Sequence, residues 1–178
     1  MLDEKRIKEA ESNVTGYLQD RLLKKESNNA ARLMYIENSE LSLETAQKLL
    51  SLESDSYKPY LWVIVCSYYS MYYIANAVLL EFGYKVGDKV SHKVTGDALI
   101  VFIRNKLKKE LLEEYEELQE DALELISSKV DTLIINIDLE REKRSKFQYR
   151  MDEELKKGKA LTSLERAKEF IFEMKKLL

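Results

Sequence analysis

The chain has 178 residues, the usual size of one domain and enough to bury a substantial core. Hydrophobic residues make up 45% and charged residues 34%, with only five glycines and one proline, so the composition favours helices over a turn-rich β fold. The formal net charge of -3 excludes the overall basic field with which most nucleic-acid binders attract phosphates. Any such binding must therefore be local.

Cysteine usage and the N-terminal segment bear on the compartment. A single cysteine, Cys66, excludes an internal disulfide and a cysteine-based zinc cluster, and it suits a reducing environment. The first twelve residues are charged from the third onward and contain no apolar stretch of signal-peptide type. We therefore expect a cytoplasmic protein.

Two amphipathic helices are expected in the first third of the chain. Apolar residues recur at helical spacing over 7–22 and again over 31–49. Asn38 and Ser39 are candidates to interrupt the second helix, which stops at a cluster of capping residues over 53–56.

The third predicted helix, over 60–82, is the most distinctive element. No residue from Tyr60 to Leu80 is charged, and this run spans roughly 30 Å as a helix, enough to cross a bilayer. Tyrosines and serines occupy its middle, whereas membrane tyrosines concentrate at the two interfaces. Every other predicted helix is amphipathic and needs an apolar partner, so we expect no membrane association and place this helix at the centre of a soluble bundle.

The flanks of this helix carry start and stop signals. Pro59 fits a first helical turn, and Asp55 or Ser56 can cap the turn before it. Gly83 ends the helix, and a loop is expected over 84–93.

The C-terminal half predicts further helices. One ends near Leu107, and another carries an apolar seam at Leu111, Tyr115, Leu118, Ala122 and Leu125. A separate helix is expected over 131–150. Gly158 is expected to break the chain, and Thr162 to Glu165 forms a capping box that opens the last helix.

These elements predict an all-α fold, an up-and-down bundle of four to five main helices around the central apolar helix. Nothing marks a linker or a repeat, so we expect a single domain over 1–178. Within it, residues 1–26 form an extra N-terminal helix and residues 31–178 form the bundle.

The residue types exclude several kinds of site. One histidine and one cysteine cannot build the ordinary metal sites in one chain, and the sequence has no Gly-rich phosphate loop. Acidic residues over 110–124 alternate with the apolar seam as a solvated helix face does, which favours a surface over a carboxylate metal site. We expect no metal and no cofactor.

Charge is separated along the sequence. Residues 104–124 hold four basic and eight acidic side chains, whereas residues 141–159 hold eight basic and four acidic ones. The basic stretch includes Phe147 and Tyr149, so it could bind phosphate and stack a base. It could equally form internal salt bridges with the acidic helix, and both readings stay open at this point.

A tyrosine-rich segment over 67–77 (SYYSMYYIANA) is followed by a leucine pair at 79–80, a short loop and the triplet Ser-His-Lys at 91–93. This combination resembles the HEPN family. The later stretch over 141–149 is similar to the arginine-bearing helix of that family, so the likeness covers roughly residues 31–178. It implies an up-and-down helical bundle, usually a homodimer, that binds nucleotides or RNA, and many members partner a small nucleotidyltransferase.

Nuclease members of this family carry an arginine followed four to six residues later by a histidine. Here Arg144 is followed at that distance by Tyr149. A tyrosine with a pKa near ~10 is a poorer general base at neutral pH than a histidine near ~6.5. Two residues five apart on a helix also point about 140° away from each other. The sequence therefore favours binding over catalysis.

The candidate ligand-binding residues are Arg141, Arg144, Tyr149, His92, Lys93 and Tyr69. His92 precedes a helix whose N-terminal amides favour anions, although a cap or an exposed loop residue is the more common role of a lone histidine. The first hypothesis is a non-catalytic module that binds a nucleotide, RNA or a nucleotidyltransferase.

Two alternatives remain. One is a residual, metal-independent ribonuclease or toxin of a toxin-antitoxin pair, with His92, Arg144 and Tyr149 as catalytic candidates and Arg144 stabilising the cleaved phosphate. The other is a helical bundle that docks a protein partner through its charged faces.

Overall fold

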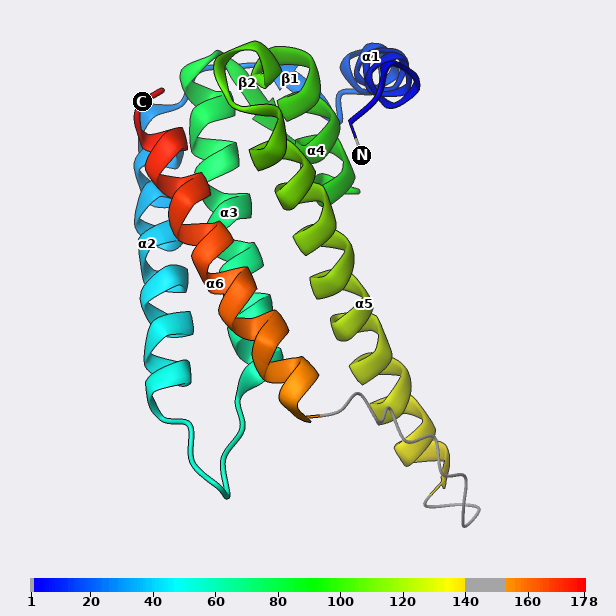
Figure 1. The fold of residues 1–178 in the computed structure, drawn as a ribbon. Coiled ribbons are helices and arrows are strands. Elements are labelled where there is room, and N and C mark those ends of the chain that lie inside the picture. Colours follow the sequence, from blue (N-terminus) through cyan, green and yellow to red (C-terminus); the bar gives the residue numbers. More distant parts are fainter. Residues whose placement is uncertain (1, 140–152) are drawn as a thin grey trace.

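A computed structural model describes residues 2–139 and 153–178, and over 128–139 and at residue 153 it describes only the helical backbone. The fold is all-α, as predicted, with one small sheet (Figure 1). In chain order the elements are α1 (Glu4–Gln19), β1 (Leu23–Lys25), α2 (Asn29–Ser51), α3 (Tyr60–Glu81), β2 (Tyr84–Val86), α4 (Ser91–Phe102), the 3-10 helix η1 (Arg104–Lys106), α5 (Lys109–Leu139) and α6 (Glu153–Lys175).

Helix α3 is the core of the bundle. Helices α2, α4, α5 and α6 all pack on it, and the long helices α2, α3, α5 and α6 run alternately down and up (Figure 1). Among the described residues, α3 alone is long and apolar enough to cross a membrane, and 83% of its most apolar window is buried inside the fold. The helices around α3 account for that burial, so the prediction of a central apolar helix in an up-and-down bundle is confirmed.

The short sheet was not predicted, because residues 84–93 were expected to form a loop. Strands β1 and β2 pair antiparallel, with Lys24 opposite Lys85. Gly83, with φ of +80°, makes the turn from α3 into β2, as its stop signal predicted. Three residues per strand carry too little alternation to be recognised from sequence.

The predicted interruption of α2 is wrong. Ser39 is fully buried in the middle of the helix, and its hydroxyl donates a 2.7 Å hydrogen bond to the Ser70 carbonyl of α3. A buried hydroxyl with a partner on the neighbouring helix does not compete with its own backbone, so the helix continues.

The predicted side-chain cap of α3 is also wrong. Pro59 occupies the N-cap position, and no side chain caps the helix. Ser54 and Tyr57 instead form an isolated antiparallel bridge in the turn before it.

Two boundaries in the C-terminal half differ from the prediction. Helix α5 continues without a break to Leu139, so no separate helix begins near residue 131. Helix α6 begins at Glu153, which places Gly158 and the expected capping box inside a helix. The fully buried Ala160 and the buried Ser163 and Leu164 show the reason, because packing against α3 continues through this segment and overrides the local signals.

Helix α1 is fastened to α4 and α5 by a buried carboxylate. Asp97 of α4 is fully buried and pairs with the Arg6 guanidinium at 2.7 Å. It also accepts hydrogen bonds from Asn13 Nδ2 at 3.0 Å and the Tyr17 hydroxyl at 2.9 Å. Arg6 bridges on to Glu116 of α5 at 2.8 Å. The charge is buried because three side chains of α1 satisfy it.

Candidate functional site

The histidine lies at the start of α4 against three tyrosines of α3. The Tyr68 hydroxyl is 2.6 Å from His92 Nδ1. The imidazole centroid is 4.6 Å from the Tyr72 ring and 5.8 Å from the Tyr69 ring. Tyr68 and Tyr72 meet His92 because they are four residues apart on α3 and so share one face of the helix.

Burial determines the protonation of this pair. Tyr68 is fully buried, and burial raises the pKa of its phenol, so the hydroxyl keeps its proton. Burial also lowers the pKa of the half-buried His92, which favours the neutral imidazole. Which of the two atoms donates in this hydrogen bond depends on the imidazole nitrogen that carries the proton.

Behind Tyr68 lies a second buried phenol. Tyr115 of α5 has its ring centroid 6.1 Å from that of Tyr68. Burial raises the pKa of Tyr115 as well, and its hydroxyl has no hydrogen-bond partner within the described residues. The Tyr68 phenol beside it raises the pKa of Tyr115 further.

The aromatic cluster extends away from His92 toward α2. Tyr69 lies 5.9 Å from Tyr73, centroid to centroid, and Tyr73 stacks on Tyr35 of α2 at 6.1 Å. Tyr35, Tyr69, Tyr72 and Tyr73 are all partly exposed, whereas Tyr68 is fully buried. The α3 tyrosines are therefore divided between the core and the surface. We call the partly exposed rings, together with His92, the tyrosine-histidine cluster.

The N-terminus of α4 borders the cluster. No side chain caps it, and the residue before it, Val90, has φ of +46°, an unusual conformation for a β-branched residue. Lys93 is exposed beside His92 and forms no ion pair with any described residue. Uncapped helix amides and an adjacent ammonium group favour an anion here.

The structure brings two of the six predicted ligand-binding residues, Tyr69 and His92, together. Tyr69 and His92 are in ring contact, and Lys93 follows His92 on the same helix. Arg141, Arg144 and Tyr149, and with them the part of the predicted 131–150 helix beyond residue 139, lie outside the described residues.

Two of the three described lysines of the basic stretch form internal salt bridges. Lys157 pairs with Glu53 at 2.7 Å, and Lys159 pairs with Asp121 of the acidic helix at 3.0 Å. For Lys159, the predicted alternative of a salt bridge to the acidic helix is correct, whereas the partner of Lys157 lies outside that helix. No group of three or more possible metal ligands occurs among the described residues.

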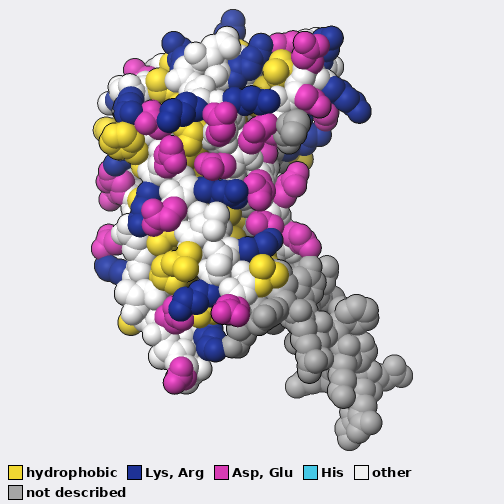
Figure 2. Space-filling model, viewed as in Figure 1, with side chains coloured by type: hydrophobic (Ala, Val, Ile, Leu, Met, Phe, Trp, Pro, Cys, Tyr) yellow, Lys and Arg dark blue, Asp and Glu magenta, His cyan; other side chains and the backbone are white. Residues whose placement is uncertain are grey.

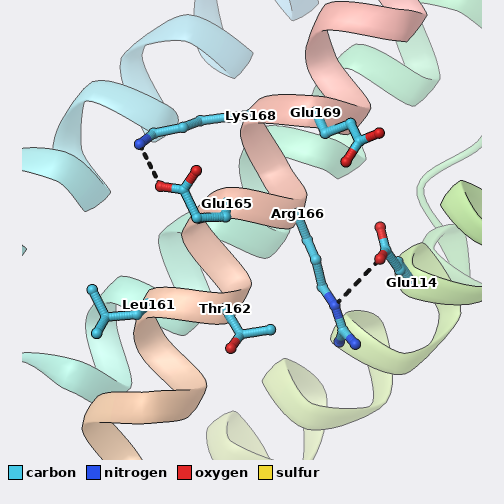
Figure 3. A pocket seen from close by; sticks show the side chains of 7 residues that line it. All are labelled: Glu114, Leu161, Thr162, Glu165, Arg166, Lys168 and Glu169. Atoms are coloured by element: carbon cyan, nitrogen blue, oxygen red, sulfur yellow. Dashed lines mark hydrogen bonds and ion pairs between the residues drawn. The ribbon is translucent and has the colours of Figure 1, made fainter.

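A shallow cleft between α5 and α6 is a weaker candidate. Its lining residues are Glu114, Leu161, Thr162, Glu165, Arg166, Lys168 and Glu169 (Figure 3). Arg166 pairs with Glu114, and Lys168 pairs with Glu165, so its two cations are already compensated. Figure 2 shows basic and acidic side chains interspersed over this face. The cleft therefore offers no concentration of charge to a ligand.

Sequence reasoning missed Tyr68 as the partner of the histidine and Tyr115 as the phenol behind Tyr68. Tyr115 was recognised only as part of an apolar seam, and Tyr68 as one of four adjacent tyrosines. Their separations from His92, 24 and 23 residues, follow no local period. Only the packing of α4 and α5 against α3 brings them together.

Comparison with known proteins identifies no relative of this chain. No family model, no curated protein and no solved structure matches the chain. The case for a function therefore rests on the chain's own residues and on the resemblance carried by its motifs.

Proposed function

We propose that this protein is a HEPN-type module that binds a nucleotide or RNA without cleaving it, through the tyrosine-histidine cluster and the adjoining N-terminus of α4. The observation that carries this proposal is the position of His92, held by Tyr68 at 2.6 Å among partly exposed tyrosine rings and next to the exposed Lys93.

The chemistry of the cluster suits a nucleotide. Partly exposed tyrosine rings offer faces on which a base can stack, and such stacking contributes about 1–3 kcal/mol per base. Lys93 and the uncapped amides of α4 offer positive charge for a phosphate beside those rings. Aromatic rings of α3 and the N-terminus of α4 therefore meet at His92.

The same site supports binding more than catalysis. A general base needs a group that orients it and raises its basicity, commonly a carboxylate. Among the described residues His92 hydrogen-bonds only to a phenol. We accordingly propose a non-catalytic, cytoplasmic module that acts as a homodimer, with a small nucleotidyltransferase as a possible partner class, and treat ribonuclease activity as an outcome of the test.

The test is binding of fluorescently labelled single-stranded RNA and of ATP to the purified protein at several salt concentrations. We expect Tyr69→Ala to weaken binding at least about fivefold, because one stacking face is lost. Lys93→Ala should weaken binding and reduce the salt dependence by about one counterion.

The matched control is Lys108→Ala, which removes an exposed lysine just before α5, outside the cluster. Equal loss in Lys93→Ala and Lys108→Ala would contradict the assigned site, as would the absence of binding to either probe. Recovery of shortened RNA that disappears in His92→Ala would replace the binding proposal with the ribonuclease alternative.

A further inference from the structure

The hydrogen bond between Tyr68 and His92 determines which imidazole nitrogen carries the proton. The phenol is fully buried and protonated, and its oxygen lies 2.6 Å from Nδ1. A neutral imidazole has one N–H, and with Nδ1 acting as acceptor that N–H must be on Nε2.

We infer that Tyr68 is a positioning residue that fixes His92 as the Nε2–H tautomer, so that the ligand atom bound by this imidazole is a hydrogen-bond acceptor such as a phosphate or carbonyl oxygen. The tautomer follows from the fold alone, and the statement about the ligand rests on the proposed function.

The surroundings of Tyr68 oppose the other tautomer. With a proton on Nδ1, the Tyr68 oxygen would accept, and its own buried proton would need a different acceptor. The hydroxyl of Tyr115, the buried phenol behind Tyr68, forms no hydrogen bond with Tyr68 or with any other described residue. A buried donor left unpaired costs more than a typical hydrogen bond contributes, so the Nε2–H form is favoured.

The other titratable groups around the imidazole do not reverse this preference. They are Tyr69 and Tyr72 from α3 and Lys93 from α4, with Tyr115 of α5 behind Tyr68. Among these described neighbours there is no carboxylate to stabilise an imidazolium. The neutral donor form is the one that these groups support.

This tautomer has a consequence for chemistry at the site. Nδ1 is occupied by Tyr68, and Nε2 carries a proton, so neither nitrogen is free to accept a proton from a substrate hydroxyl. His92 then holds an acceptor atom of the ligand in place. The geometry thus deepens the binding proposal by defining what the ligand must present.

The tautomer can be read directly, because His92 is the only histidine in the chain. Long-range proton-nitrogen NMR spectra of the ¹⁵N-labelled protein near pH 8 should show a pyrrole-like Nε2 and a pyridine-like Nδ1. In Tyr68→Phe we expect a mixture of tautomers and a His92 pKa higher by about 0.5–1 unit, since the donor to the neutral form is lost.

Tyr115→Phe is the matched control, because it removes the neighbouring buried hydroxyl and leaves the Tyr68 bond in place. It should keep the wild-type tautomer. A protonated Nδ1 in the wild type, or spectra that do not change in Tyr68→Phe, would overturn the inference. If Tyr68→Phe does not fold, the wild-type spectrum alone decides the tautomer.

The ligand statement has its own variants. The amide nitrogen of glutamine can replace Nε2, and that of asparagine can replace Nδ1. We expect His92→Gln to bind single-stranded RNA within about threefold of wild type and His92→Asn to lose about tenfold, one hydrogen bond. The reverse order would refute the acceptor assignment. If the wild type binds no RNA yet shows the Nε2–H tautomer, the proposed function fails and the positioning role of Tyr68 stands.

Discussion

At the scale of single residues, the ionisable groups Asp97 and His92 differ in the partners that the fold gives them. Asp97 is buried as a charge, because Arg6, Asn13 and Tyr17 compensate it. His92 has no such compensation and is kept neutral, since burial lowers its pKa and its one described hydrogen bond comes from a phenol. Because their partners differ, Asp97 anchors α1 to the bundle, whereas His92 is a candidate ligand-binding group.

The neutral histidine gives the stability a defined pH dependence. The pKa of His92 is lower in the folded protein than its unfolded value near ~6.5, so the unfolded chain binds the proton more readily. The free energy of unfolding should therefore fall as the pH drops below about 6.5, and should be unaffected by this group above it.

The measurement is urea unfolding between pH 8 and pH 5 for the wild type and for His92→Gln, which cannot titrate. Taking the difference removes the shared contribution of the carboxylates. We expect the wild type to lose stability relative to His92→Gln on acidification. A relative gain would mean that the folded protein holds a protonated imidazole.

At the scale of elements, tertiary packing prevailed over local signals in α2 and α6. Ser39 and Gly158 both look like helix interruptions in the sequence, and both lie within helices. The hydrophobic pattern predicted helices correctly where it repeated over many residues. The helix breaks predicted from the single residues Ser39 and Gly158 were wrong. Helix boundaries depend on neighbours such as α3, which a one-dimensional signal does not include.

Substitution of glycine by alanine tests whether a glycine lies inside a helix or at its end. Nothing lies within 4 Å of a Cβ built on Gly158, which is exposed inside α6. Gly158→Ala should raise the free energy of unfolding by about 0.5–1 kcal/mol, through higher helix propensity and a less flexible unfolded chain.

Gly83 supplies the contrast, because its φ of +80° is unfavourable for alanine although the space is free. Gly83→Ala should lower the free energy of unfolding by about 1 kcal/mol. Denaturant curves of both variants decide the point. A destabilising Gly158→Ala would argue for a real helix break at that position.

At the scale of the whole molecule, the N-terminal helix belongs to the same hydrophobic core as the bundle. Ala10 and Val14 of α1 are buried in the cluster that also contains the α3 side chains. The polar link between α1 and the bundle is the buried network around Asp97, with Glu11 and Arg104 forming a more exposed pair at 3.2 Å.

These two ion pairs should differ strongly in their contribution. Arg6→Ala leaves a buried carboxylate without its cation and should cost about 2–4 kcal/mol, somewhat below a fully buried pair because Arg6 keeps some exposure. Arg104→Ala removes an exposed pair across the same α1 boundary and should cost at most about 1 kcal/mol.

Both variants are measured by thermal unfolding and by hydrogen exchange of the α1 amides. Faster exchange confined to α1 in Arg6→Ala would indicate local release of the helix before global unfolding. Equal costs for the two variants would contradict the special role of the buried network.

The sequence by itself determined the fold class and the central helix. A run of 21 uncharged residues from Tyr60 to Leu80, flanked by amphipathic helices, has few ways to bury its surface other than a bundle around it. It also indicated His92, Lys93 and Tyr69 as binding candidates, and the structure places the Tyr69 ring of α3 against His92 at the start of α4.

Only the tertiary structure decided how the polar groups pair. Tyr68 meets His92 across 24 positions, and Arg6 meets Asp97 across 91, because α4 packs between α1 and α3. Hydrophobic periodicity specifies which face of a helix is buried, but not which polar atom it meets on another element. The pairing of polar atoms depends on the register between packed helices. The tautomer of the histidine depends on the same register.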